Sequence, residues 1–261
     1  MKNKESFISL TNDKELQLKI KNLIDKAEIT RKRHIVTRSN FLDPFEQKSM
    51  YSFLKAYFNE ISCEFYGGID NSERKILVMS PKWKANNMEE YIKSLIIYGL
   101  FDNISHRDVL GSIMALGIKR ETIGDIIIYP DRIIIIVLSE IADYIIYNLV
   151  KIKNIKIKHI EISDLNSLEL PERSYDILNK TVNSMRVDGF ISAVCNITRE
   201  DSQNLCKRGL VKINWEIVVK SHRLIKENDL ISVKGYGRFA LMNINGTTKS
   251  GRFHIIVKKY K

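Results

Sequence analysis

The stretch NITREDSQNLCKRGLVKINWEIV, residues 196–218, has the pattern of a short helix that stops on a glycine and continues into a strand. Thr198, followed three residues later by Asp201, is typical of a helix start, and Gly209 suits the left-handed backbone that ends many helices. The pattern therefore predicts a helix over 199–208 with a strand after it. Four basic side chains surround this corner: Arg199, Lys207, Arg208 and Lys212.

Such a cluster is either ordinary solvated surface or a surface that binds a polyanion. Lysine and arginine near the C-terminus of a helix interact favourably with the helix dipole, which explains Lys207 and Arg208. Arg199 lies at the opposite, positive end of the predicted helix, where the dipole offers no such gain. The helix dipole therefore explains only part of the cluster, and both interpretations, solvated surface and polyanion-binding surface, stay open.

The excess positive charge of the chain is concentrated in its last third. The 261 residues carry a formal net charge of +11 with a pI near 9.4. Residues 182–261 hold 15 Lys/Arg and 6 Asp/Glu, or +9, whereas residues 1–181 hold 27 and 25, or +2. A compact basic region joined to a near-neutral one indicates a phosphate backbone or an anionic lipid as partner.

Predicted elements on both sides of the corner extend the basic region into a domain. After the helix, apolar residues alternate around Lys212, which predicts a strand that turns at Asn214 and Trp215. A second turn and strand bring Lys234 and Arg238 near the same corner. The short helix predicted before the corner has an apolar stripe of Val187, Phe190, Ile191 and Val194.

Residues 1–90 are predicted to form a small α/β lobe. Apolar side chains recur on one face of a first helix, and Pro44 lies in the first turn of a second. Two strands follow, in CEFYGG and RKILVMSP. The apolar face of the first helix consists of Leu16, Ile20, Leu23, Ile24 and Ala27.

Residues 91–165 are predicted to form a ferredoxin-like (RRM-like) domain. Strand and helix patterns follow in the order β-α-β-β-α-β, with the last strand over 155–162. RNA-recognition sheets display aromatic side chains on the third strand, but the corresponding run here, RIIIIVL at 132–138, has none. We therefore expect this sheet to be a scaffold or a protein contact surface, and the order of elements alone serves many unrelated functions.

Together these patterns predict an α+β chain. An N-terminal α/β lobe (1–90) precedes the ferredoxin-like middle domain (91–165). A linker is expected over 166–181, where periodicity is lost and Pro171 lies among polar residues. The basic domain (182–261) ends in a predicted hairpin.

Several classes of protein do not fit the sequence. No apolar segment follows the lysines of MKNKESFISL as in a secretory signal, and the longest aliphatic run, IIIIVL, is far below the ~18 residues of a membrane span. We therefore expect a cytoplasmic protein without a membrane partner. Cys63, Cys195 and Cys206 lack a C-x-x-C spacing, which favours reduced thiols over a disulfide or a zinc site. No metal and no cofactor are expected.

Four motifs of the basic domain resemble the S4 RNA-binding domain: RVDGF, NITRED, LCKRGLVKINWE and ENDLISVKGYGRF. They cover about residues 184–240. The S4 (αL) domain is a compact helix-helix-strand module that binds RNA, so the resemblance implies this fold for 182–261. Asn228 stands where S4 domains usually place glycine, but asparagine tolerates the same left-handed turn.

Motifs in the rest of the chain narrow the resemblance. FLDP, GGIDNSERK and SHRDVLGSIMALGIKRETIGDIII, together with the S4 motifs, resemble the YlmH family of bacterial S4 proteins over most of residues 41–258. The resemblance implies a factor that acts by binding, not an enzyme, in ribosome-associated quality control. Implied partners are 23S rRNA and peptidyl-tRNA on the large (50S) ribosomal subunit, with another quality-control factor as a further candidate. Off the ribosome a monomer is expected. Phe45 departs from the arginine expected after DP.

The resemblance also assigns roles to residues. Arg186 and Arg199 match the S4 arginine positions, and Asp188 between them is expected to be structural. Trp215 is either a core residue or a base-stacking group. The implied RNA-binding surface comprises Arg186, Arg199, Lys207, Arg208, Lys212, Asn214, Lys234 and Arg238.

Two alternatives stay open. S4 modules also occur in pseudouridine synthases and tyrosyl-tRNA synthetases, but the aspartate of RVD here belongs to the S4 motif itself, and no catalytic motif is found in residues 1–181. A cell-division or membrane-surface adaptor would need an amphipathic helix with exposed aromatic residues beside the lysines, and the sequence shows no clear pattern of this kind. For His106, Arg107 and Asp108 we prefer helix capping over chemistry, so no catalytic residue is predicted.

Overall fold

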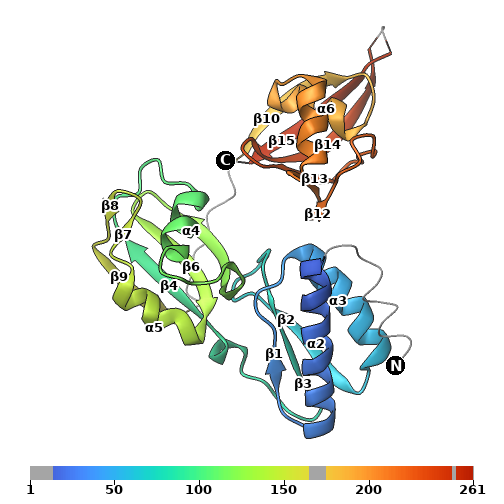
Figure 1. Ribbon diagram of the computed structural model, residues 1–261. Coiled ribbons are helices and arrows are strands. Elements are labelled where there is room, and N and C mark those ends of the chain that lie inside the picture. Colours follow the sequence, from blue (N-terminus) through green and yellow to red (C-terminus); the bar gives the residue numbers. More distant parts are fainter. Residues whose placement is uncertain (1–13, 165–174, 249–250, 261) are drawn as a thin grey trace. The chain divides into compact units, whose positions relative to one another are not determined.

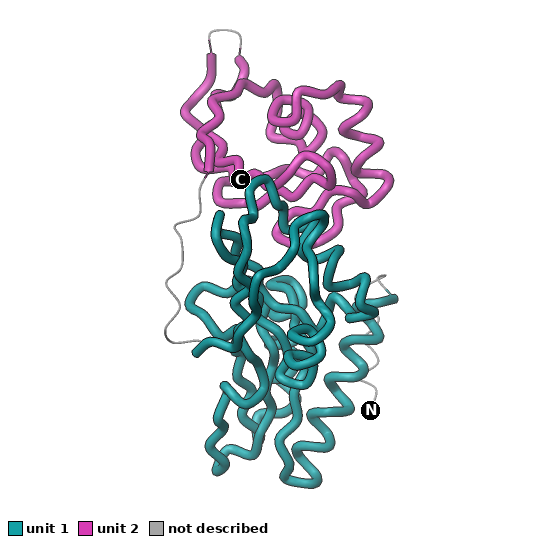
Figure 2. The backbone as a smooth tube through the Cα atoms, turned by 90° about the vertical axis from the view of Figure 1, so that its left-hand side faces the viewer, with its two compact units in different colours: residues 1–170 teal, residues 171–261 magenta. Residues whose placement is uncertain are grey.

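The computed structural model describes residues 14–164, 175–248 and 251–260, which form a mixed α/β fold (Figure 1). The chain divides into two compact units, Met1–Leu170 (unit 1) and Pro171–Lys261 (unit 2), shown in Figure 2. Among the described residues, no helix combines the length and the apolar character that crossing a membrane requires.

The first part of unit 1 is a three-stranded antiparallel sheet covered by two helices. Helices α2 (Lys14–Arg33) and α3 (Pro44–Tyr57) pack on a sheet of order β1-β3-β2. Its strands are β1 (Thr37–Arg38), β2 (Ile61–Tyr66) and β3 (Ile76–Pro81). Both predicted helices and both predicted strands are confirmed. Strand β1 is too short to produce a sequence pattern.

The second part of unit 1 contains a four-stranded antiparallel sheet of order β5-β6-β4-β9. Its elements follow one another in the predicted order β-α-β-β-α-β. They are β4 (Ile92–Tyr98), α4 (His106–Met114), β5 (Ile123–Ile128), β6 (Arg132–Leu138), α5 (Ser139–Asn148) and β9 (His159–Ser163), with 3-10 turns at η1 (Met88–Glu90) and η2 (Arg120–Thr122).

A small hairpin precedes the last strand of this sheet. Strands β7 (Lys151–Ile152) and β8 (Ile155–Lys156) pair with each other in a separate two-stranded sheet, whereas β9 pairs with β4. The single strand predicted over 155–162 is therefore wrong, because this segment belongs to two sheets. Isoleucine alternates at 155 and 157 and again at 160 and 162, but the three-residue step from Ile157 to Ile160 shifts the phase where the two strands separate, so the sequence carried a signal of the break that the prediction missed.

Unit 1 is built of four layers. Successive side chains of its central strands point to opposite faces, and this alternation explains the layers. On β3, Leu77 joins the core with α2 and α3, whereas Ile76 faces the four-stranded sheet. On β6, Ile134 packs with Ile76, whereas Ile135 joins the core with α4 and α5. The order is therefore helices, three-stranded sheet, four-stranded sheet, helices. Both faces of the central strands β4 and β6 of the four-stranded sheet are mostly buried, whereas most of the edge strand β9 is exposed.

Unit 2 packs two short helices on one face of a six-stranded antiparallel sheet of order β10-β15-β14-β13-β11-β12. Helices α6 (Val187–Cys195) and α7 (Arg199–Lys207) lie where the sequence predicted helices. The strands are β10 (Tyr175–Val182), β11 (Val211–Ile213), β12 (Glu216–Ile217), β13 (Leu230–Val233), β14 (Gly237–Thr247) and β15 (Phe253–Tyr260).

Strand β10 begins inside the stretch that was predicted as a linker. It pairs with β15 from Tyr175 to Val182, at one edge of the sheet. Most of its side chains are at least partly exposed, so it lacks the clean apolar alternation by which a strand is predicted. Residues 165–174, which include most of that linker, lie outside the described residues.

Candidate nucleic-acid interface

A tight corner between two helices brings Arg186 and Arg199 to one place. Arg186 is the N-cap residue of α6, and Arg199 is the first residue of α7. Helix α6 ends at Asn196, whose φ of 54° is left-handed, a conformation that asparagine tolerates. Thr198 then caps α7, because its Oγ1 accepts a hydrogen bond from the backbone nitrogen of Asp201 at 3.0 Å.

One buried carboxylate holds both arginines. The side chain of Asp188 is fully buried, and its Oδ2 lies 3.0 Å from Arg186 Nη2 and 3.2 Å from Arg199 Nε. Gln203 Nε2 donates to the same oxygen at 3.0 Å. Arg199 and Gln203 are four residues apart in α7 and therefore share a face. The structural role predicted for Asp188 is confirmed, whereas Gln203 was missed although its spacing from Arg199 is visible in the sequence.

The network keeps Asp188 ionised and leaves the arginines accessible. Burial by itself raises the pKa of Asp188. Hydrogen bonds from Arg199, Gln203 and Arg186 lower it by more than burial raises it, so the pKa lies below its ordinary value. The side chains of Arg186 and Arg199 are 37% and 50% exposed. A guanidinium has five donors in a planar fork, so donors remain on both for an external oxyanion.

Three further basic residues share the corner at the end of α7. Lys207 is the last residue of α7 and Arg208 is its C-cap, and both are exposed. Lys234 follows β13, and its backbone nitrogen donates to the carbonyl oxygen of Leu210 at 2.9 Å. This bond holds the turn with Lys234 next to the segment that leaves α7.

Lys212 and Arg238 lie on a different surface of unit 2. Each pairs in register with Ser232 of β13, so the three residues form a row across neighbouring strands. Val211 and Ile213, on either side of Lys212, belong to the core with the helices. Lys212 and Arg238 therefore face away from α6 and α7. The predicted set is divided between the helix side and the opposite face of the sheet.

Asn214 and Trp215 form the predicted turn between β11 and β12. Both have left-handed φ values, 50° and 67°, as a two-residue type I′ turn requires. Asn214 Nδ2 donates to Asp229 Oδ1 at 2.8 Å, and Asn214 Oδ1 accepts from the backbone nitrogen of Leu230 at 2.9 Å. The amide therefore has a structural role, and its contact with RNA stays a prediction. Trp215 is half-buried.

The SHRD motif of unit 1 caps a helix, as predicted. Ser105 Oγ accepts from the backbone nitrogen of Asp108 at 3.3 Å, and Asp108 Oδ2 accepts from the backbone nitrogen of Ser105 at 3.0 Å. The pair is a reciprocal capping box at the start of α4. Hydrogen bonds from Ser105 lower the pKa of Asp108.

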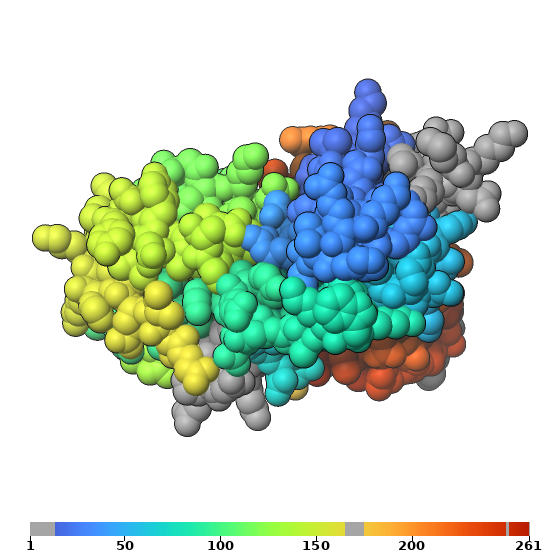
Figure 3. Space-filling view, turned by 90° about the horizontal axis from the view of Figure 1, so that it is seen from below, coloured from blue at the N-terminus to red at the C-terminus, as the bar shows by residue number. Residues whose placement is uncertain are grey.

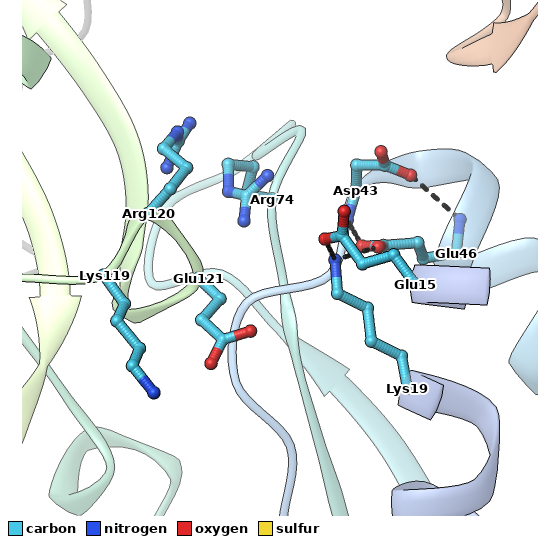
Figure 4. Close-up of a pocket in the computed structure, with 8 residues that line it drawn as sticks. All are labelled: Glu15, Lys19, Asp43, Glu46, Arg74, Lys119, Arg120 and Glu121. Carbon is cyan, nitrogen blue, oxygen red and sulfur yellow. Dashed lines mark hydrogen bonds and ion pairs between the residues drawn. The ribbon is translucent and has the colours of Figure 1, made fainter. Parts of the chain in front are cut away.

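A charged pocket of about 400 Å³ in unit 1 is explained by structural contacts (Figure 4). Lys19 bridges Glu15 and Glu46 at 2.9 and 2.8 Å, and Asp43 caps α3 by accepting from the backbone nitrogen of Glu46 at 2.9 Å. Arg74 donates to two backbone carbonyls. The pocket is lined by Glu15, Lys19, Asp43, Glu46, Arg74, Lys119, Arg120 and Glu121.

The described parts of the chain also bear on the predictions about metal ligands and thiols. Those residues contain no group of three or more His, Cys, Asp or Glu that could hold a metal ion. Cys63, Cys195 and Cys206 are free thiols, and burial raises the pKa of each to about 11. They are therefore protonated at neutral pH.

Three comparisons with known proteins point to one family. The family model described as a putative RNA-binding domain in YlmH matches residues 96–166. The chain is 28% identical over 247 residues to "Ribosome-associated protein quality control protein P2" of Bacillus subtilis (strain 168). The aligned residues make up 93% of this chain and 94% of that protein. A solved structure, "Cell division protein ylmH from Streptococcus pneumoniae", is similar in fold, with a TM-score of 0.52 at 19% identity, over 61% of this chain and 98% of that one. All three matches agree with the resemblance to the YlmH family that the sequence motifs indicate.

Proposed function

We propose that this protein is an RNA-binding factor of ribosome-associated quality control and that unit 2 is its S4 RNA-binding domain. The name of the Bacillus subtilis relative and the description of the family model support this role. The observation that carries the proposal is the pair of arginines held side by side by the buried carboxylate of Asp188.

The Asp188 network prepares the arginines for phosphate. Ordering a free arginine side chain costs up to about 2 kcal/mol of conformational entropy. Because the carboxylate orients both guanidinium groups in the folded protein, much of this cost is met before RNA binds. Their exposed edges then donate to phosphate oxygens, which positions the protein on folded RNA without reading its sequence.

The order of elements in unit 2 supports the S4 assignment. Two short helices, α6 and α7, lead directly into β11, as in a helix-helix-strand module. Asn228, at the position where glycine was expected, has a φ of 69° and so adopts the left-handed turn. Lys207, Arg208 and Lys234 extend the arginine surface, and Lys212, Asn214 and Arg238 would provide contacts from the sheet.

In unit 1 we propose a ferredoxin-like middle domain over 91–165, preceded by the α/β lobe over 1–90. The strand order β5-β6-β4-β9, with α4 and α5 as the two crossovers, supports this assignment. A linker within 166–181 and an S4 domain over 182–261 complete the proposed organisation.

The proposed target is 23S rRNA and peptidyl-tRNA on the large (50S) ribosomal subunit in the cytoplasm, where the protein acts by binding and not by catalysis. Gradient sedimentation of the tagged protein from lysate tests this placement. We expect it to migrate with free large subunits that are enriched in peptidyl-tRNA. Protein that stays at the top of the gradient would contradict it.

The arginine pair is tested by Arg186→Gln with Arg199→Gln. Glutamine places its Nε2 where Arg199 Nε donates to Asp188, and circular dichroism checks that the variant stays folded while the charge of both side chains is lost. The plot of log affinity against log salt for deproteinised large-subunit RNA should flatten by about 1.4 to 1.8, or 0.7 to 0.9 for each phosphate contact. Lys220→Gln with Lys226→Gln, two exposed residues of unit 2, removes the same charge and is the matched control. Equal slopes for both variants would refute the assigned surface.

A further inference from the structure

In the sheet of unit 1 that overlaps the matched RNA-binding domain, the central strands β4 and β6 have no open face for bases, and exposed positions gather on the edge strand β9. One face is covered by α4 and α5. On the other, Ile92, Ile134 and Ile136 are almost fully buried against Ile76 and Val78 of the three-stranded sheet. An RNA-recognition sheet needs an exposed face on which bases stack. If residues 96–166 contact RNA, they use a surface other than the central strands of this sheet.

The β7–β8 hairpin displays an unusual density of lysine. Lys151, Lys153, Lys156 and Lys158 are all exposed, and residues 150–160 contain no Asp or Glu. In Figure 1 the hairpin lies at the end of unit 1 away from α2 and α3. Figure 3 shows residues of this part of the chain, in yellow and yellow-green, at the surface of that end. The hairpin is therefore a compact positive surface in a unit whose overall charge is close to zero.

The hairpin places two like charges opposite each other. Lys151 and Lys156 are directly paired in register, and so are Ile152 and Ile155 beside them. Both isoleucines pack into the core with α4 and α5, so the two lysines point to the opposite, solvent side. Like charges in directly opposed positions destabilise a hairpin. This arrangement costs stability in the free protein.

Within the described residues these lysines have little internal compensation. Lys153 lies 3.8 Å from Asp108, a loose contact between partly exposed groups. No ion pair involves Lys151, Lys156 or Lys158 in the described parts of the chain. An external polyanion would therefore relieve the repulsion.

We propose that the β7–β8 lysine hairpin is a second RNA-binding surface, which contacts the phosphate backbone of structured RNA. This inference rests on the proposed function and specifies how unit 1 takes part in it. Tyr147, near the end of α5 and four residues before Lys151, is 82% exposed and provides an aromatic ring close to the lysines in the chain. An RNA backbone is favoured over an acidic protein because the hairpin lies within residues matched by the RNA-binding model.

The test replaces the four lysines of the hairpin, Lys151, Lys153, Lys156 and Lys158, with glutamine in the full chain. Affinity for deproteinised large-subunit RNA should fall by at least about tenfold at physiological salt, and the salt slope should flatten by about 0.7 to 0.9 for each lysine that neutralises a phosphate in the wild-type complex. Removing the like-charge pair should leave the melting temperature unchanged or raise it. An unchanged or higher melting temperature shows that the variant is folded, so that weaker RNA binding cannot be ascribed to unfolding.

The matched control makes the same change at four exposed lysines of α2 and α3, at the other end of unit 1: Lys14, Lys21, Lys48 and Lys55. It should keep wild-type affinity within about threefold, since only screened long-range attraction is removed. An equal loss of affinity in both variants would overturn the hairpin as a site, because net charge alone would explain it.

The outcomes separate this inference from the proposed function. If Arg186→Gln with Arg199→Gln weakens RNA binding and the hairpin variant does not, the hairpin inference fails and the proposed function stands. If wild-type protein does not bind this RNA, both fail. If the hairpin variant binds RNA normally but no longer binds intact large subunits, the lysines contact an acidic protein surface and the inference is overturned.

Discussion

The four-stranded sheet of unit 1 and the six-stranded sheet of unit 2 use their second faces in opposite ways. In unit 1 a further sheet buries the central strands on the face that turns away from α4 and α5. In unit 2 the face that turns away from α6 and α7 presents Lys212, Ser232 and Arg238 in one row. Strand order therefore does not decide whether a sheet can bind a ligand. What decides it is whether another layer covers the face.

Two aspartates, each of which follows an arginine closely in the sequence, also differ in function because their surroundings differ. Asp108 folds back on the start of its own helix and forms a capping box with Ser105. Asp188 lies in the first turn of α6 but is buried, and it holds arginines from two elements. The first carboxylate stabilises a helix end, and the second organises a surface.

The largest effect that would sharpen this comparison is expected from Asp188→Ala. It leaves Gln203 and both arginines without their acceptor, so the free energy of unfolding of unit 2 should fall by roughly 2 to 4 kcal/mol. Trp83 and Trp215 are the two tryptophans of the chain, one in each unit. Urea unfolding followed by Trp215 fluorescence in a Trp83→Phe background measures the change. RNA affinity should fall as well.

Glu200→Ala is the control for this experiment. Glu200 is an exposed acid in the same helix corner, and its removal should change the stability of unit 2 by no more than about 0.5 kcal/mol. If Asp188→Ala and Glu200→Ala have the same small effect, the buried carboxylate does not organise the corner.

The acid dependence of unit 2 gives a second, smaller effect. The pKa of Asp188 is lowered in the folded protein, so its contribution to stability is complete above the unfolded value of about 3.9 and is lost as the pH falls toward the lower folded value. Between pH 5 and pH 3 the wild-type protein should therefore lose stability more steeply than Asp188→Asn, when both are followed by Trp215 fluorescence in urea. Parallel curves would show that Asp188 does not contribute to the acid response.

The smallest effects are expected from one helix cap in each unit. Ser105→Ala and Thr198→Ala each remove a side-chain acceptor at a helix start and should cost about 1 kcal/mol. Trp83 fluorescence in a Trp215→Phe background should report only the Ser105 change, and Trp215 fluorescence only the Thr198 change. If each tryptophan responds equally to both mutations, the two units unfold as one and the comparison between them loses its thermodynamic basis.

Local patterns predicted the local structure of the candidate site. The Thr198 cap and the turn at Asn214 and Trp215 follow from side-chain chemistry within a few residues, and both are present. The break between β8 and β9 and the strand β10 were not predicted. For β10 the missing information was the pairing partner, because a strand is defined by its neighbour as much as by its own residues. The break between β8 and β9 was marked in the sequence by the phase shift from Ile157 to Ile160.

The sequence by itself determined where the charge lies, where α7 begins, and that Arg186 and Arg199 lie in motifs that resemble the S4 domain. Those features depend on composition and on contacts between residues close in the chain. Only the tertiary structure decided that Asp188 joins the two arginines, that Lys212 and Arg238 face the other side, and that the central strands of the four-stranded sheet of unit 1 are covered. Each of these depends on which face of an element meets which neighbour, and packing between distant segments sets that choice.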